Sequence, residues 1–104
     1  MEALEKKEEL NKLFDLYGTL LTDKQILYFG LYFREDYSLQ EISELYQVSR
    51  NAVFDHLKKV EEHLHFYEEK LHLLELQEQR TKIIDEALEK KDISLLEQLR
   101  KLDE

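Results

Sequence analysis

The absence of proline is the feature that most constrains this sequence. None of its 104 residues is proline, and glycine occurs only as Gly18 and Gly30. Because these two residue types disrupt helices most strongly, few local barriers to helix formation remain. Leu, Glu and Lys, which favour helices, dominate the rest of the chain. We therefore expect an all-α protein that is helical almost throughout.

The length and the lack of cysteine narrow the possible protein classes further. A chain of 104 residues has room for one modest core. Without cysteine, a disulfide framework or a thiolate metal site is impossible, and a reducing compartment suits the chain. The charged N-terminus is unlike a secretory signal, and no stretch approaches the ~20 apolar residues that span a bilayer. We expect a single cytoplasmic domain over residues 1–104 with no membrane span.

The net charge of −9 is distributed unevenly along the chain. Residues 1–23 contain three basic and six acidic side chains, residues 24–60 contain five of each, and residues 61–104 contain seven and thirteen. A protein this acidic cannot coat nucleic acid without regard to sequence, because phosphates would be repelled. Any contact with DNA should therefore be local and should fall in the neutral middle segment.

Helical periodicity and capping motifs predict the first two helices. Apolar residues share one face over residues 3–17, which indicates the first helix. Thr22 and Gln25 have the spacing of a capping box, which opens a second helix that ends near Arg34. That helix is apolar around most of its circumference, so we expect it at the centre of the core. The aromatic residues expected in the core are Phe14, Tyr28, Phe29, Tyr32 and Phe33.

Residues 38–60 have the pattern of a helix-turn-helix unit. Ser38 and Glu41 form a second capping box, which opens a helix to about Tyr46, and Ser49 suits the N-cap of the next helix. The two helices should touch through small or apolar residues. The residues expected at this contact are Ile42, Ser43, Leu45, Val48, Ala52, Val53 and Leu57.

The turn of this unit contains Gln47, where glycine is usual. We expect its backbone to adopt the left-handed conformation, at a cost of about 1 kcal/mol for a residue with a side chain. The departure weakens the motif without excluding it.

The opposite side of the second helix should face outward, where it could enter a major groove of DNA. The predicted contacts are Ser49, Arg50, Asn51, Phe54, Asp55, Lys58 and Lys59. Arg50 suits a guanine edge or a phosphate, Asn51 an adenine edge, and Phe54 a thymine methyl group. Ser49 and Lys58 suit phosphates, whereas Asp55 would have to read a cytosine or pair with a lysine. The same geometry could instead serve contacts with a protein.

From Arg50 onward, apolar residues recur at alternating intervals of four and three. They are Val53, Leu57, Val60, Leu64, Tyr67, Leu71 and Leu74. This heptad spacing predicts a long, extended helix that packs on a partner helix. The partner is either the chain's own N-terminal helix or a second copy. The expected dimer seam consists of Leu64, Tyr67, Leu71 and Leu74.

Residues 61–104 are predicted to form an acidic helical tail beyond the helix-turn-helix unit. Within it, Thr81 is a candidate cap for a further helix, which would place a break near Arg80. Another break is expected near Lys91 and Asp92. The spacing of Ser94 and Glu97 then indicates a third capping box before a last helix.

No pattern in the sequence indicates an enzyme or a metal site. The pairs Glu62 with His65 and Glu69 with His72 have the spacing found in carboxylate-bridged metal bundles. Counted from the heptad seam, however, both pairs fall on the outer face of the helix. There is also no glycine-rich phosphate loop and no nucleophile motif. We expect no catalytic residues, no cofactor and no metal.

Over nearly its whole length, the sequence resembles the YlxM family of bacterial helix-turn-helix proteins. The resemblance rests on LFDLY (13–17), LLT (20–22), YSLQEI (37–42) and, most specifically, VSRNAVFD (48–55). More distantly, residues 20–60 are similar to region four of bacterial sigma factors, which reads promoter DNA. The resemblance implies base contacts by Arg50, Asn51 and Phe54, and a regulator linked to the signal recognition particle pathway through gene neighbourhood.

These observations lead to two functional hypotheses for an all-α, sigma region four-like helix-turn-helix bundle with a long helix and C-terminal helices. The leading hypothesis is a regulatory protein that binds duplex DNA and forms a homodimer, which presents two recognition helices to a two-fold site. The alternative is an adaptor of the signal recognition particle pathway that does not bind DNA. In that case the same face would bind a protein or RNA, and the acidic tail would meet a basic partner.

Overall fold

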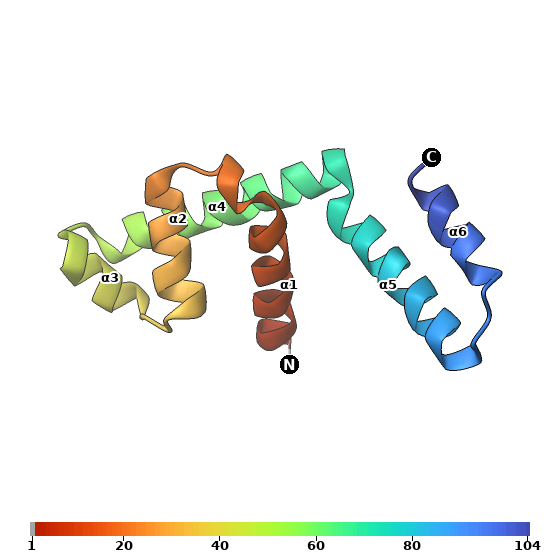
Figure 1. Cartoon of the computed structure of the whole chain (residues 1–104). Coiled ribbons are helices and arrows are strands. Elements are labelled where there is room, and N and C mark those ends of the chain that lie inside the picture. The colour runs from red at the N-terminus through yellow and green to blue at the C-terminus, as the bar shows by residue number, and fades with distance from the viewer. Residues whose placement is uncertain (1) are drawn as a thin grey trace. The chain divides into compact units, whose positions relative to one another are not determined.

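The computed structural model describes residues 2–104, with side chains described from Leu4 onward. Within this range every regular element is helical, which confirms the predicted all-α fold. The elements are α1 (Glu2–Tyr17), η1 (Gly18–Leu20), α2 (Asp23–Phe29), η2 (Gly30–Arg34), α3 (Leu39–Tyr46), α4 (Arg50–Leu71), α5 (Leu73–Lys90) and α6 (Leu95–Leu102) (Figure 1). η1 is a 3₁₀ turn and η2 is a π turn. None of the described helices combines the length and the apolar content of a membrane-spanning segment.

The helices form two compact units. The first ends at Lys70 and contains α1 to α3 with nearly all of α4, and the second consists of Leu71–Glu104. The expectation of one domain over residues 1–104, with a helix-turn-helix unit at 38–60 and an acidic tail at 61–104, stays a prediction.

Both capping boxes predicted in the first unit are present. The Thr22 hydroxyl oxygen accepts the backbone N–H of Gln25 at 3.2 Å, and the Gln25 side chain accepts the backbone N–H of Thr22 at 2.9 Å. Ser38 and Glu41 exchange the same two bonds at 3.0 Å each. These bonds satisfy amides that a helix leaves unpaired at its start. They explain why α2 and α3 begin where the sequence predicts.

The core of the first unit is built around α2, as expected. Its buried apolar residues are Leu10, Leu13, Tyr17, Leu21, Tyr28, Phe29, Leu31, Phe33, Ile42, Val53, Leu57, Val60 and Leu64. The rings of Phe14 and Phe29 are stacked, with centroids 4.3 Å apart. A Cβ on Gly18 would approach the Phe14 ring to 3.3 Å. Gly18, which has no side chain, therefore leaves room for this ring at the end of α1.

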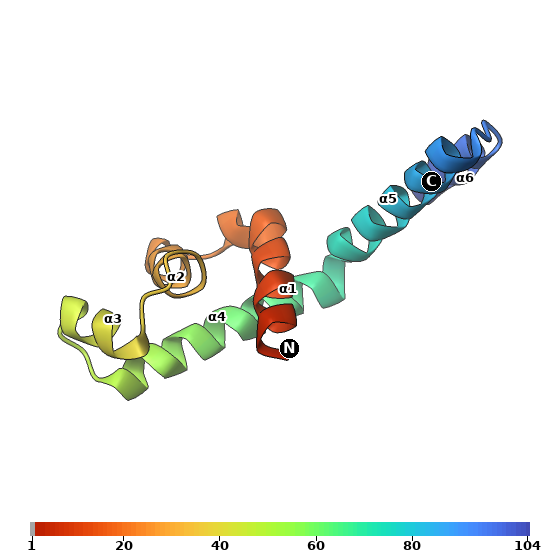
Figure 2. The same ribbon diagram turned by 90° about the horizontal axis from the view of Figure 1, so that it is seen from below.

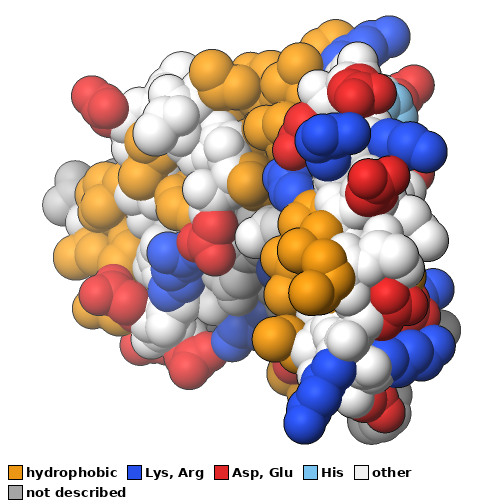
Figure 3. All heavy atoms as spheres, turned by 45° about the vertical axis from the view of Figure 1, so that its right-hand side comes forward, with side chains coloured by type: hydrophobic (Ala, Val, Ile, Leu, Met, Phe, Trp, Pro, Cys, Tyr) orange, Lys and Arg blue, Asp and Glu red, His pale blue; other side chains and the backbone are white. Residues whose placement is uncertain are grey.

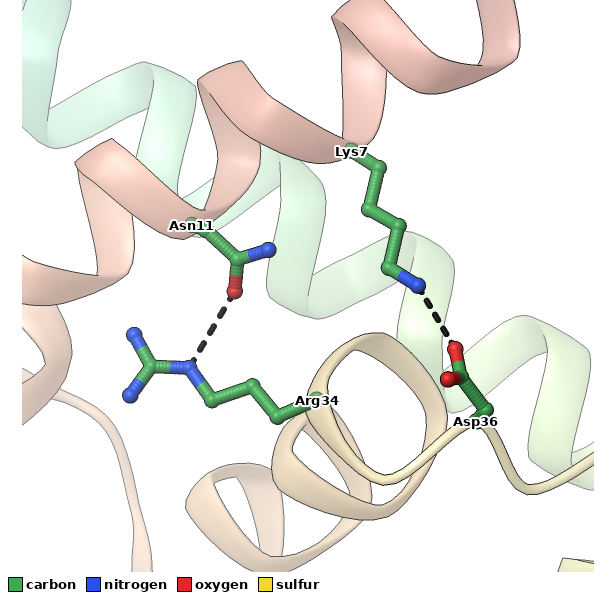
Figure 4. Close-up of polar contacts among 4 residues, drawn as sticks. All are labelled: Lys7, Asn11, Arg34 and Asp36. Atoms are coloured by element: carbon green, nitrogen blue, oxygen red, sulfur yellow. Dashed lines mark hydrogen bonds and ion pairs between the residues drawn. The ribbon is translucent and has the colours of Figure 1, made fainter.

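The end of the α2–η2 segment is tied to α1 by exposed polar contacts. Arg34 donates to Asn11 at 3.1 Å and to Asp15 at 2.6 Å, and its guanidinium lies over the Phe14 ring. Lys7 pairs with Asp36 at 2.7 Å (Figure 4). The sequence did not predict that the helix widens into a π turn from Gly30 to Arg34. Such single π turns leave no distinct hydrophobic pattern.

The turn between α3 and α4 has the strained residue that the sequence predicts. Gln47 has φ 54° and ψ 45°, in the left-handed region. The adjoining residues stabilise this turn, because the Ser43 hydroxyl donates to the Val48 carbonyl at 2.7 Å. The Ser49 side chain accepts the N–H of Ala52 at 3.0 Å, which confirms Ser49 as the cap of α4.

The helix boundaries after α4 differ in part from the prediction. α4 ends at Leu71, because His72 adopts a left-handed backbone conformation with φ 57°. α5 then continues through Arg80 and Thr81, so the proposed cap at Thr81 was wrong. The expected break near Lys91 is confirmed, since Lys91 is also left-handed.

The third predicted capping box was also wrong. Ser94 precedes α6, but its side chain makes no capping bond. Its hydroxyl instead donates to the Asp92 carboxylate at 2.6 Å, and its backbone N–H donates to the same oxygen at 3.0 Å. The Ser94 hydroxyl is the main reason that the pKa of Asp92 is lowered. Asp92 therefore accepts the bonds that organise this turn, because an ionised carboxylate is the stronger acceptor.

In the second unit, α5 and α6 form an antiparallel hairpin, as Figure 1 and Figure 2 both show. Arg80 of α5 pairs with Asp103, just after α6, at 3.2 Å. Leu74 is the one buried side chain of Leu71–Glu104, a range that the structure describes in full. The hairpin therefore has almost no core of its own.

His56 connects α4 to the central helix. Its ring centroid lies 4.6 Å from that of Tyr28, and its Nε2 atom is buried without a hydrogen-bond partner among the described residues. Burial and the nearby Lys24 lower the pKa of His56 below the usual 6.5; Lys59 acts in the same direction, and a hydrogen bond with the Lys24 backbone opposes them. The fold thus favours the neutral imidazole.

This environment predicts a pH-dependent stability. Because the pKa of His56 is lower in the folded chain than in the unfolded chain, its contribution is complete above 6.5 and is lost progressively as the pH falls below that value. Urea unfolding between about pH 7.5 and 5.5 should therefore show a smaller loss of stability in His56→Gln than in the parent. His65→Gln, on an exposed site of the same helix, should behave as the parent. Equal losses in all three proteins would contradict this prediction.

The left-handed Gln47 predicts a stabilising substitution. Gln47→Gly should raise the free energy of unfolding by about 0.5–1 kcal/mol, because glycine adopts this conformation without strain. Gln40→Gly, in the ordinary helical backbone of α3, is the matched control and should lower it by about 1 kcal/mol. Urea unfolding measures both. A Gln47→Gly protein less stable than the parent would contradict this prediction. It would show that the contacts of the Gln47 side chain stabilise the fold by more than its left-handed backbone conformation costs.

Candidate nucleic-acid interface

The inward side of the helix-turn-helix unit is made mainly by residues that the sequence predicts. Ile42 and Val53 are fully buried, Leu57 and Ser43 are almost so, and Val48 is half-buried. Two assignments were wrong. Leu45 is 56% exposed, because Tyr46 takes the contact with the central helix and places its ring 5.2 Å from that of Tyr28.

Ala52 is the second residue assigned wrongly to the inward side, since it is exposed. The buried stripe of α4 passes through Val53, Leu57, Val60 and Leu64. Adjacent helical residues are about 100° apart around the axis, so Ala52 lies beside the stripe rather than on it. Ala52 therefore borders the outward face of α4.

The seven residues predicted to contact DNA all lie at the start of α4 and are all exposed. They are Ser49, Arg50, Asn51, Phe54, Asp55, Lys58 and Lys59. We call them the recognition face. Phe54 is 52% exposed, which leaves about half of a large apolar side chain in contact with solvent. The burial pattern leaves these side chains open to a groove-sized partner, while their role as DNA contacts stays a prediction.

The charged side chains of the recognition face form no ion pairs with other described residues. Among the described side chains, no ion pair includes Arg50, Asp55, Lys58 or Lys59. The first turn of α4 also contains no acidic residue. The positive end of the helix dipole and the free cations therefore act together, which favours an anionic partner at this end of α4.

An open groove of about 680 Å³ adjoins the recognition face. Phe54 and Lys58 line it from α4, and Lys6 and Lys7 line it from α1. Lys6 pairs with Glu61 at 3.2 Å, which holds one cation at the groove. Sequence reasoning could not find these two lysines, because they are about fifty residues away from Phe54 and Lys58 along the chain.

The predicted dimer seam is split between different environments. Leu64 is fully buried in the first unit, and the ring of half-buried Tyr67 lies 6.0 Å from that of Tyr17. Leu71 is 50% exposed, and Leu74 lies buried in the second unit beyond the end of α4. Whether any of the four contacts a second copy stays a prediction.

The chain's own N-terminal helix is a partner of α4. The Tyr17 hydroxyl donates to the Glu68 carboxylate at 2.6 Å, and Lys6 pairs with Glu61. Of the two packing partners expected for the long helix, the chain's own N-terminal helix is therefore present.

The histidines do not gather into a site. Gln25 and His63 are hydrogen-bonded at 3.1 Å, and His72 pairs with Glu75 at 3.2 Å. Among the described residues, no group of three or more potential metal ligands lies together.

Comparison with known proteins gives a consistent picture. A family model described as "Putative helix-turn-helix protein, YlxM / p13 like" matches residues 4–103. A UPF0122 protein of Lactococcus lactis subsp. cremoris is 43% identical over 106 residues, which cover 97% of this chain and 96% of the relative. A UPF0122 protein of Bacillus licheniformis is 49% identical over 107 residues, with coverage of 97% and 99%. The resemblance to YlxM proteins is thereby confirmed, and the chain belongs to the UPF0122 family of YlxM / p13-like helix-turn-helix proteins.

Proposed function

We propose that this protein is a cytoplasmic regulator that binds duplex DNA through the start of α4. The observation that carries the proposal is the division of this helix into two sides. One side buries Val53 and Leu57 in the core, and the other presents Arg50 and Asn51 to solvent. A recognition helix needs this division, because its position must be fixed while its base-reading side chains stay free.

The side chains of the recognition face have complementary roles in this proposal. Arg50 and Asn51 stand in the first turn, where they would meet guanine and adenine edges in the major groove. Phe54, one turn later, would contact a thymine methyl group. Lys58, together with the capping Ser49, would contact phosphates and set the register on the duplex.

The net charge of −9 shapes how such binding would work. Only a few phosphates would be neutralised, so the affinity of one copy should be low and its salt dependence shallow. A homodimer would join two such contacts on a two-fold site and raise the affinity through effective concentration. Regulation by a dimer is therefore part of the proposal.

The alternative function is an adaptor of the signal recognition particle pathway that does not bind DNA. Its specific support is the acidity of residues 61–104, which contain thirteen acidic and seven basic side chains. Such a segment would attract a basic protein and repel nucleic acid. In this case the recognition face would bind a protein or a structured RNA.

Arg50→Ala tests base reading. With duplexes selected from a random pool, fluorescence anisotropy should show a loss of about 1–3 kcal/mol in binding free energy and a relaxed preference at one base pair. Lys12→Ala, an exposed lysine of α1, removes the same charge away from the recognition face and should bind as the parent does. If neither substitution changes affinity or preference, α4 does not read the bases.

Lys58→Ala tests the phosphate contact. Its affinity should fall by a similar factor on every duplex, and the slope of log affinity against log salt should decrease by about one unit. The same titrations are run on the parent. Absence of salt-dependent binding to any duplex by the parent, even at low salt, would refute the DNA-binding proposal and favour the adaptor.

A further inference from the structure

The groove beside the recognition face lies within the first unit and has the size of a small-molecule site. Its volume of about 680 Å³ falls within the range of about 300–1,000 Å³ that ligand pockets have. Residues of α1, of the stretch 32–39 and of α4 line it. Hydrophobic side chains also reach the surface among charged ones in Figure 3. The groove is concave as well as apolar, so a molecule bound in it would be contacted from three segments of the chain.

The lining of the groove combines buried and half-exposed apolar side chains. Phe33 and Leu57 are 7% and 4% exposed, so they form its most deeply buried part. Phe54 and Tyr37 are 52% and 36% exposed and leave much of their rings in contact with solvent. Covering such rings removes a large apolar area from water. The lining therefore favours a ligand with an apolar body.

The backbone of one wall departs from regular helix at two points. The N–H of Glu35 donates to the Gly30 carbonyl at 3.0 Å, which closes the π turn η2. Asp36 then adopts the left-handed conformation with φ 61°. Both features are costly, and both recur at functional sites. Here they lie between Tyr32 and Tyr37, which line the same groove.

The charges around the groove leave one lysine without a counter-ion. Lys6 pairs with Glu61 at 3.2 Å, and Lys7 pairs with Asp36 at 2.7 Å. Lys58 also lines the groove but forms no ion pair with any described residue. The two pairs neutralise their own charges, so one positive charge remains beside the apolar lining. It is complementary to a ligand with one negative charge.

We infer that the groove binds a small apolar carboxylate, whose carboxylate group pairs with Lys58 while its apolar body covers Phe54 and Tyr37. Both parts of the lining are matched by such a ligand. A nucleic acid carries many charges, whereas only one lysine of the groove is unpaired. An extended peptide would need free backbone partners, but α1 and α4 bond their own backbone groups internally.

A bound carboxylate would also affect the recognition face, which shares Phe54 and Lys58 with the groove. These two side chains cannot contact the ligand and a duplex at the same time. The carboxylate would therefore compete with DNA and act as an effector that releases it. This step rests on the proposed function, whereas binding of the carboxylate does not.

The test uses cinnamate, an aromatic carboxylate, and cinnamyl alcohol, its uncharged analogue. Each probe is titrated into the full chain without DNA, and the amide chemical shifts are followed by NMR. The parent should bind cinnamate at least about tenfold more tightly than the alcohol, because only cinnamate forms a charge-assisted bond. Phe54→Ala should weaken the binding of both probes.

Two neighbouring lysines provide the matched variants. Lys58→Ala should remove the preference for cinnamate over the alcohol. Lys59→Ala removes the same charge from an exposed site outside the groove and should keep the preference. A parent that binds neither probe, or binds both equally, overturns the inference and leaves the groove to DNA or a protein partner. Equal effects of the two lysine substitutions overturn it as well.

The outcomes separate this inference from the DNA-binding proposal. A parent that prefers cinnamate through Lys58 but binds no duplex would refute the DNA-binding proposal alone. If the parent binds a duplex, saturating cinnamate should lower its affinity at least about tenfold in the parent, and much less in Lys58→Ala. Cinnamate binding that leaves duplex affinity unchanged would overturn the effector role.

Discussion

Two adjacent aromatic residues of α2 hold the first unit together. Phe29 stacks on Phe14 of α1, and Tyr28 contacts both Tyr46 of α3 and His56 of α4. Every other α-helix of this unit therefore has an aromatic contact with α2. Large rings bury much area with few rotatable bonds, so such contacts fix helix positions effectively. The angle at which α3 meets α4, and hence the exposure of the recognition face, follows from this central packing.

The local signals in the sequence predicted most of this fold because they depend on few residues. Capping boxes at Thr22 and Ser38 need only a side chain and the amides of the next turn, and both were confirmed. The left-handed Gln47 was also predicted, since the turn of a helix-turn-helix unit requires that conformation. Signals of this kind do not depend on distant parts of the chain.

Predictions failed where two local signals competed, or where the structure depends on contacts with residues far away in the sequence. Ser94 had the spacing of a capping box, but the ionised Asp92 two residues earlier accepts its hydrogen bonds instead. Leu45 was assigned to the core, yet its neighbour Tyr46 reaches the ring of Tyr28. The helix breaks at His72 although the heptad spacing continues past this position in the sequence. No residue preference at His72 indicates the break. The exposure of the predicted contacts on α4 follows from local helical periodicity, and their role stays a prediction, whereas the groove lysines of α1 required the tertiary fold.

The two sides of α4 have separate consequences for how this family can diverge. Substitutions on the buried side change packing and therefore stability, while Arg50, Asn51 and Phe54 are exposed, so substitutions there leave the buried stripe of α4 unchanged. In the proposed function, relatives would thus acquire new binding preferences in single steps, without first acquiring compensating changes in the interior. The scaffold and its exposed face can evolve at different rates.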